Sequence, residues 1–348
     1  MKLNEFIQLI LTGDNMKRKL IIHIGMGKTG SSSIQKSLRL SRNKLEAKGL
    51  LYLGLMFEHI NIPTNYSWHK VDGWSNFISL NKSQANSELA HTLQYLDAHL
   101  DDSIHTLIWS NEALFDRPSD VLSALNSISS RYQIIVVGYL RRPDKWISSA
   151  YLQWGLKDKS YIGPIKTFNE WVSDKPYTVS PKLDTWNTLS ESVYFYNFDD
   201  IKDVSIHFIK GVLELDISDI KPVRENDTPP PAAMALFSYY NSFFNERNSP
   251  NRVEQLLQKT GCYESSPSSA DFNELIPSKE DIIIYLNKCG EELTKINEYL
   301  IKNNQNELNI NEVSHKDLHI TQSDINRILL KIILELNSEI ETLKLKNK

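Results

Sequence analysis

The chain has 348 residues, of which 41% are hydrophobic and 24% are charged, as is usual for a globular protein. Collagen-like and low-complexity repeat proteins are excluded by this composition. There are 39 Lys and Arg against 43 Asp and Glu, a formal net charge of −4, so a bulk nucleic-acid binder is not expected. The two cysteines, Cys262 and Cys289, are too few for a disulfide framework or a zinc cluster.

Membrane attachment is not expected either. No apolar run comes near the ~20 residues that span a bilayer. Residues 1–15 have a short apolar core interrupted by Gln8 and lack the layout of a signal peptide. With so few cysteines, a reduced, cytoplasmic location fits best, with no nucleic acid and no integral membrane segment.

Strand and helix patterns alternate from residue 19 to about residue 215. Short runs rich in β-branched residues predict strands. The predicted strands are 19–24, 50–55, 103–109, 132–140 and 193–198. Helical patterns follow them within 34–49, 87–101, 118–130, 141–156 and 200–213. This alternation predicts an α/β fold with a mostly parallel sheet flanked by helices.

The pattern changes beyond residue 225, where a proline-rich link precedes a helix. Residues 245–277 are predicted as a polar loop, and two helices, 278–302 and 321–344, close the chain. The last helix carries an apolar stripe of Ile325, Leu329, Ile332, Leu336, Ile340 and Leu343. The stripe favours packing on the domain, and a homo-oligomer contact through this helix is the alternative.

A glycine- and serine-containing loop, GMGKTGSSS, joins the first strand to the first helix. Such a loop offers backbone N–H groups at a helix N-terminus, where the helix dipole also favours an anion. The residues expected to bind phosphate are Gly27, Lys28, Thr29, Gly30, Ser31, Ser32 and Ser33. An ordinary turn is the alternative. The Walker A pattern is not met, because Ile22 stands where its first glycine belongs.

A second candidate anion site follows the strand YQIIVVGYL. Arg141 comes at the end of this strand, and Ser149 lies 8 residues later in the next helix. An arginine fork and a serine hydroxyl suit one phosphate. If the two strands are adjacent and parallel, both motifs lie at the carboxyl edge of the sheet. Solvated surface arginines are the alternative.

Two phosphate-binding motifs in one chain indicate a ligand with phosphates at both ends. The sequence resembles the PAPS-dependent sulfotransferases (PAPS is 3′-phosphoadenosine 5′-phosphosulfate), especially bacterial carbohydrate-type members. IHIGMGKTGSSSIQKSL resembles their 5′-phosphosulfate loop, and YLRRPDKWISSAYLQ resembles their 3′-phosphate motif, with Arg141 and Ser149 in matching positions. TLIWSNEAL and NDTPPPAAMALFSYYN resemble further segments of the family. The similarity covers about residues 19–245.

The resemblance implies a P-loop-like domain at 19–245, with an extension at 1–18. The helical C-terminal region, 246–348, then packs on this domain or mediates assembly. The chain departs from the family in two places: Ser33 replaces a tryptophan that often follows the loop, and the later Arg-Lys-Gly motif is not evident. Arg142, Arg224 and Lys316 are candidates for the missing donors.

The implied reaction is sulfuryl transfer from PAPS to a hydroxyl or amine of a carbohydrate or glycolipid, with no metal required. Lys28 and the loop N–H groups suit the charge that develops on the leaving phosphate. Glu112 and His69 are the leading candidates for a general base, with His59 and Glu58 behind them. Each has a structural alternative, such as a helix cap or a packed ring. His23, inside the first strand, is expected to be a core residue.

Aromatic residues in 66–74 and 151–154 are candidates for sugar-stacking walls or for core. Two other function classes stay open from the residues. A P-loop NTP-dependent kinase would need magnesium and a carboxylate to hold it. In a non-catalytic nucleotide-binding assembly protein, the C-terminal helix would be the main functional element and would mediate assembly.

Overall fold

The computed structural model describes residues 17–189, 192–218, 220–225, 229–260, 272–316, 318 and 320–346. The chain forms two compact units, each built from separated stretches. Unit 1 combines the chain up to Leu140 with Val179–Arg224 and Tyr299–Asn306. Unit 2 combines Arg141–Thr178, Glu225–Glu298 and the chain from Glu307 onward. The division at residues 18 and 245 remains a prediction.

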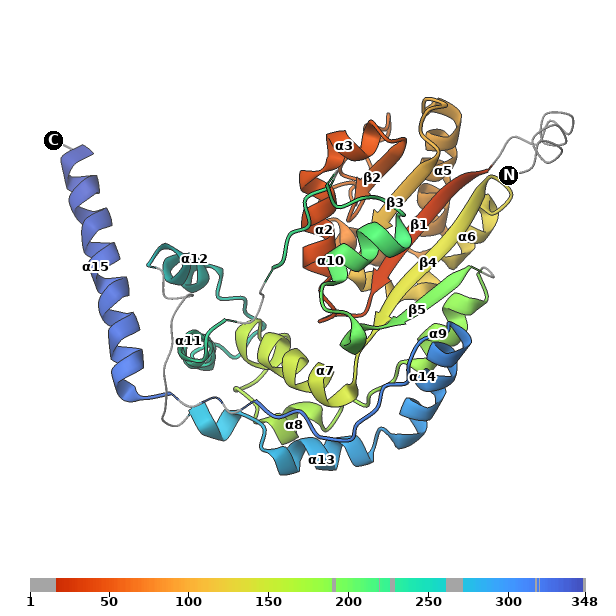
Figure 1. Ribbon diagram of the computed structural model, residues 1–348. Helices are drawn as coiled ribbons and strands as arrows, with labels where there is room; N and C mark the ends of the chain where they lie inside the picture. Colours follow the sequence, from red (N-terminus) through yellow and green to blue (C-terminus); the bar gives the residue numbers. More distant parts are fainter. Residues whose placement is uncertain are drawn as a thin grey trace, which may run out of the picture. The chain divides into compact units, whose positions relative to one another are not determined.

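Unit 1 contains a five-stranded, all-parallel sheet with strand order β2-β3-β1-β4-β5 (Figure 1). Its strands are β1 (Arg18–Gly25), β2 (Leu50–Gly54), β3 (Thr106–Ser110), β4 (Tyr132–Leu140) and β5 (Val193–Asn197). The predicted α/β class and parallel sheet are confirmed. Strands β1 and β4, whose adjacency the sequence left open, pair directly, from Arg18 opposite Tyr132 to Gly25 opposite Gly138.

Helices cover both faces of this sheet, which explains why its central strand is apolar on both sides. The helices of unit 1 are α2 (Ser31–Leu40), α3 (Arg42–Glu46), α4 (Trp74–Ser79), α5 (Lys82–His99), α6 (Leu122–Ile128), α9 (Ser180–Asn187) and α10 (Val204–His207). On one face, Ile34, Leu38 and Leu45 of α2 and α3 pack with Ile21 of β1 and with Phe208. Figure 1 shows α5 and α6 on the opposite face.

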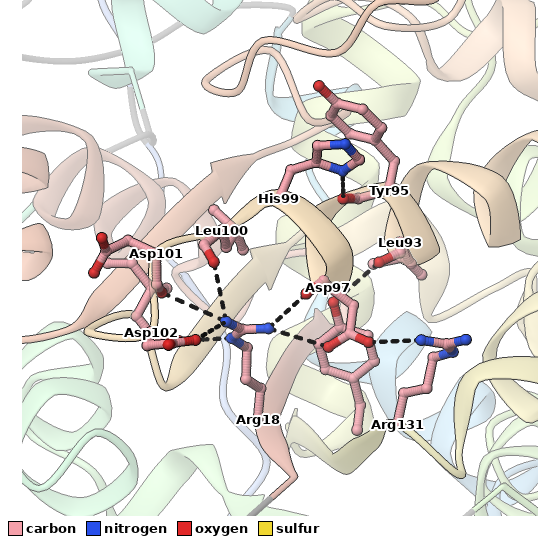
Figure 2. A network of polar contacts seen from close by, with 11 residues as sticks. Arg18, Leu93, Tyr95, Asp97, His99, Leu100, Asp101, Asp102 and Arg131 are labelled. Atoms are coloured by element: carbon pink, nitrogen blue, oxygen red, sulfur yellow. Dashed lines mark hydrogen bonds and ion pairs between the residues drawn. The ribbon is translucent and has the colours of Figure 1, made fainter. Parts of the chain in front are cut away.

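A guanidinium group fixes the start of β1 to the end of α5, far along the strand from the loop (Figure 2). Arg18 donates to the carbonyls of Asp97, Leu100 and Ile104 at 2.8, 3.2 and 2.8 Å. It also pairs with the Asp97 carboxylate at 3.2 Å, and Arg131 pairs with the other oxygen at 3.0 Å. The last carbonyls of a helix lack intrahelical donors, so this cation satisfies them and suits the negative end of the dipole.

Unit 2 is helical among the described residues. Its helices are α7 (Pro143–Ala150), a π-helical turn (Tyr151–Lys157), α8 (Phe168–Val172), α11 (Pro231–Ser242), α12 (Asn251–Lys259), α13 (Lys279–Asn287), α14 (Gly290–Lys302, whose last turn belongs to unit 1) and α15 (Gln322–Lys346). Asn241 of α11 donates to the carbonyls of Leu156 and Lys157 at 2.8 and 2.7 Å. This bond ties α11 to the irregular end of the π-helical turn.

The prediction of a loop throughout 245–277 is wrong, because α12 lies within it. Its polar composition hid the helix, but Leu257 is fully buried and Glu254 pairs with the nearly buried Lys157 at 2.6 Å. The predicted helix 278–302 is two helices, α13 and α14, with the break before Gly290. Glycine is a poor helix former, which is consistent with a break at this point.

Candidate active site

The loop after β1 is folded tightly by left-handed backbone. Gly25, Lys28 and Gly30 have φ values of 68°, 70° and 79°. Thr29, fully buried, donates from its hydroxyl to the Met26 carbonyl at 2.6 Å and braces the turn. Left-handed residues interspersed in a turn direct successive backbone N–H groups to one side, which creates an anion-binding concavity. A non-glycine residue held at positive φ, as Lys28 is, marks a strained position of the kind found in ligand-binding turns.

Ser31, the first residue of α2, carries the most informative atom of the loop. Its Oγ is buried, and among the described residues it has no hydrogen-bond partner. Gly30 precedes it as N-cap residue and has no side chain to cap the helix. Buried polar groups are nearly always paired, so a hydroxyl without a protein partner at a helix N-terminus suits a bound ligand, and the helix dipole favours an anion there.

Glu112 lies against this loop, where the sequence predicted it. It begins the 3-10 turn Glu112–Leu114 directly after β3, and Asn111 caps that turn through its side chain at 3.0 Å. A Cβ added at Gly25 would stand 2.8 Å from both the Glu112 Cβ and the Ser31 Oγ. These two atoms are therefore within about 5.6 Å of each other. Gln35 of α2 donates to Glu112 Oε2 at 2.5 Å and orients the carboxylate.

Glu58 and His59 come together at the carboxyl end of β2. The Glu58 carboxylate accepts the backbone N–H groups of Leu55 and Met56 at 3.1 and 2.8 Å, so it braces its own loop. His59 Nε2 lies 3.8 Å from Glu58 Oε1. Burial is the main cause that lowers the pKa of His59; Glu58 opposes the shift, whereas Arg42 and Arg39 add to it. His59 is thus a neutral imidazole at pH 7.

His69 and the neighbouring aromatic residues have structural contacts. His69 Nε2 donates to the Phe57 carbonyl at 2.6 Å. Trp68 is fully buried, and its ring packs against Phe57 and Phe77. Among the described residues, the structure gives His69 no contact with the loop. Of the two aromatic segments proposed as sugar-stacking walls, Trp68 and the fully buried Tyr151 belong to the core.

His23 is a core residue, as predicted. Its side chain is fully buried, Nδ1 lies 2.8 Å from Ser110 Oγ, and the rings of Tyr139 and Phe208 flank it. Burial lowers the pKa of His23 to about 3, so the ring stays neutral. The His23 carbonyl accepts the Asn111 N–H at 3.0 Å, which links this core to the turn that presents Glu112.

The second motif lies in unit 2. Arg141 accepts a hydrogen bond on its carbonyl from the Tyr177 hydroxyl at 2.7 Å, and Ser149 is buried on α7. Arg142 binds the fully buried Asp144 with two nitrogens, at 3.1 and 2.7 Å. Asp144 also accepts the Ser314 N–H at 2.8 Å, which holds that segment at the start of α7. Arg142 therefore has a structural role.

Lys316 lies in the segment held by Asp144, and its side chain is exposed. Loss of hydration lowers the pKa of Lys316, and the Arg141 charge lowers it further. Like charges that interact repel one another, and a bound anion relieves that repulsion. Arg224, the third candidate, is exposed and belongs to unit 1.

The comparisons with known proteins add no family. A scan against models of protein families and a search of curated proteins found no match to this chain. In the part of the chain that the structure describes, no helix is long and apolar enough to cross a membrane. No set of three His, Cys, Asp or Glu side chains in that part is arranged to hold a metal ion.

The sequence analysis did not identify four further residues near Glu112 and His59. Gln35 donates to Glu112, and Arg42 donates to the His59 carbonyl. The charge of Arg39 acts on Tyr52. The helical spacing of Ser31, Gln35 and Arg39 was a signal, because residues four apart share a helix face. The contact of that face with β2 and the turn after β3 depends on the crossover order of the strands, which the chain sequence alone does not show.

Proposed function

We propose that this protein is a sulfotransferase that moves the sulfuryl group of PAPS to a hydroxyl (or amine) of a carbohydrate or glycolipid. The observation that carries the proposal is the pairing of an anion-binding loop with a carboxylate. The loop is P-loop-like, with an unpaired buried Ser31 hydroxyl, and Glu112 packs against the same Gly25. A site of this kind can catalyse several reactions. The resemblance of the two motifs to those of the sulfotransferases favours sulfuryl transfer.

The loop residues suit the leaving-group side of this reaction. The acceptor oxygen bonds to sulfur while the bond from sulfur to the 5′-phosphate oxygen breaks, so negative charge grows on that phosphate. Lys28 and the N–H groups of Gly27, Thr29, Gly30 and the first turn of α2 stabilise this charge. The helix N-terminus and the left-handed turn direct these N–H groups to one side of the loop, as such stabilisation requires.

Glu112 suits the acceptor side. Its carboxylate takes the proton of the attacking hydroxyl, and the products are a sulfate ester and 3′,5′-ADP. Gln35 holds one carboxylate oxygen and leaves the other for the acceptor. A general base contributes about 10² to 10⁴ in rate. Arg141, Ser149 and Lys316 are assigned to the 3′-phosphate on the resemblance and on the adjacent charges of Arg141 and Lys316.

The test uses Glu112→Gln, which keeps the size and one oxygen of the side chain. We expect transfer of labelled sulfate from PAPS to a glycan panel to fall at least a hundredfold while 3′,5′-ADP binding is retained. Glu46→Gln, on the exposed end of α3, is the matched control and should keep full activity. Transfer at the wild-type rate by Glu112→Gln would remove Glu112 from the mechanism.

An NTP-dependent kinase is the second candidate, and the position of Glu112 favours it as well. A carboxylate after the strand next to a phosphate loop is where a magnesium ion on a nucleoside triphosphate is held. The absent first glycine at Ile22 stands against a kinase. Binding decides between them: a sulfotransferase prefers 3′,5′-ADP without magnesium, and a kinase prefers ADP or ATP with magnesium.

A further inference from the structure

A polar stripe runs along α2 and α3, away from the phosphate loop. It consists of Ser31, Gln35, Arg39 and Arg42, spaced by four, four and three residues. Within α2 this spacing places Ser31, Gln35 and Arg39 on one face of the helix. Arg42 begins the next helix, α3, directly after the break at Ser41. With a rise of 1.5 Å per residue, Arg39 stands about 6 Å beyond Gln35 along the axis. The stripe therefore begins at the proposed cofactor and ends in two positive charges.

Each member of the stripe contacts or faces a group at the carboxyl ends of β2 and β3. Gln35 binds Glu112 at 2.5 Å. Arg42 donates from Nη2 to the His59 carbonyl at 3.3 Å, and the His59 ring lies 5.4 Å from the ring of Tyr52. Arg39 is exposed, and its charge acts on both Tyr52 and His59. Gln35 and Arg42 thus reach the ends of β3 and β2 by hydrogen bonds, and Arg39 lies between them along the chain.

The two arginines at the far end lack carboxylate partners within ion-pair distance in the part of the chain that the structure describes. Among the described residues, neither Arg39 nor Arg42 forms an ion pair, and the buried Arg42 Nε has no hydrogen-bond partner there. The nearby Glu58 carboxylate is taken up by the N–H groups of Leu55 and Met56. A guanidinium nitrogen that is buried and unpaired is costly, so a ligand oxygen at this point is stabilising.

We infer that the acceptor is an anionic sugar chain, bound with a carboxylate or sulfate group on Arg39 and Arg42 while its reacting hydroxyl lies at Glu112. The inference rests on the proposed function. The guanidinium fork matches the planar oxygens of a carboxylate or two oxygens of a sulfate. The distance from Gln35 to Arg39 along the helix is comparable with a single hexose unit, so the anion lies on the reacting sugar or its neighbour.

Three probes separate charge from shape. One is a tetrasaccharide of alternating glucuronate and N-acetylglucosamine, the second is the same molecule with its carboxyl groups converted to amides, and the third is a sulfated oligosaccharide without uronate. The variants are Arg39→Gln and Arg42→Gln. Lys44→Gln, an exposed position on α3, is the control with the same change in charge. Calorimetry measures probe binding with and without 3′,5′-ADP, and transfer kinetics give KM and kcat.

For the wild type, we expect at least one anionic probe to bind about tenfold more tightly than the amide. Each arginine variant should raise the KM for that probe about tenfold, with kcat and 3′,5′-ADP affinity unchanged, and Lys44→Gln should change neither. The probe that responds identifies the anion. Equal binding of acid and amide with no response to the sulfated probe, or no binding of any probe, overturns the inference. If the protein does not bind 3′,5′-ADP, the proposed function is refuted but this inference is not. The comparison of the acid and amide probes still tests whether the arginines bind an anionic sugar.

Discussion

Replacement of His23 by Asn makes a sharp test of the core beneath the site. In the folded protein the pKa of His23 is about 3, against 6.5 for an ordinary histidine, because its ring is buried between Tyr139 and Phe208. Below pH 6.5, His23 therefore binds a proton in the unfolded chain but stays unprotonated in the folded chain until the pH approaches 3. Stability from this group is fully present above pH 6.5 and is lost as the pH falls toward 3.

The size of the effect follows from the two pKa values. Each unit corresponds to about 1.36 kcal/mol, so at pH 5 the wild type loses about 2 kcal/mol relative to pH 7 through this residue. Asn at position 23 keeps a polar group for Ser110 but has no titrating ring. His23→Asn should be less stable than the wild type at pH 7, yet lose about 2 kcal/mol less between pH 7 and pH 5.

Urea unfolding at pH 7, 6, 5.5 and 5, followed by tryptophan fluorescence, measures this difference. All other residues are the same in the two proteins, so their contributions to the pH dependence cancel in the comparison. If the free energies of unfolding of the wild type and His23→Asn run parallel from pH 7 to pH 5, His23 is not buried in its neutral form and the reasoning fails.

Three more substitutions test other parts of the account. Arg18→Met should lower the free energy of unfolding by about 2 to 3 kcal/mol, measured by urea unfolding, because the carbonyls of Asp97, Leu100 and Ile104 lose their donor. Gly30→Ala should abolish 3′,5′-ADP binding, since φ is 79° and a Cβ would meet Val204; calorimetry that shows wild-type affinity would exclude this loop as the site. Lys28→Ala should reduce sulfate transfer about 10² to 10³-fold and cofactor affinity far less; equal losses would argue against its role at the leaving oxygen.

The sheet was predictable because its strands are short, continuously apolar runs. Buried parallel strands have this composition, as β1 and β4 show. The strand order was not predictable: that β1 and β4 are neighbours was only a condition in the sequence, and the structure meets it. The ends of the helices in the C-terminal part were not predictable, such as the break between α13 and α14 before Gly290. Helix α12 was not predicted because it lies in a polar stretch. It is stabilised by burial of Leu257 and by the Lys157–Glu254 ion pair. Such tertiary contacts are not visible as a local pattern.

Within the site, Glu112 was predictable and the arginines were not. Glu112 directly follows a strand, so its place at the carboxyl edge depends only on that strand being in the sheet. Arg42 contacts the segment after β2 because the crossover from β1 to β2 leaves room for β3 between these strands. The strand order determines which face of α2 and α3 lies along the end of β2. The helix periodicity of the sequence does not distinguish this polar face from one exposed to solvent.

Calorimetric titration of the protein with 3′,5′-ADP, with 5′-AMP and with ADP plus magnesium tests the central claim most directly. The account predicts that 3′,5′-ADP binds most tightly and without magnesium, that Gly30→Ala removes this binding, and that Arg141→Ala weakens binding of 3′,5′-ADP far more than that of 5′-AMP. Preference for ADP with magnesium, or equal affinity for 3′,5′-ADP and 5′-AMP, would contradict it.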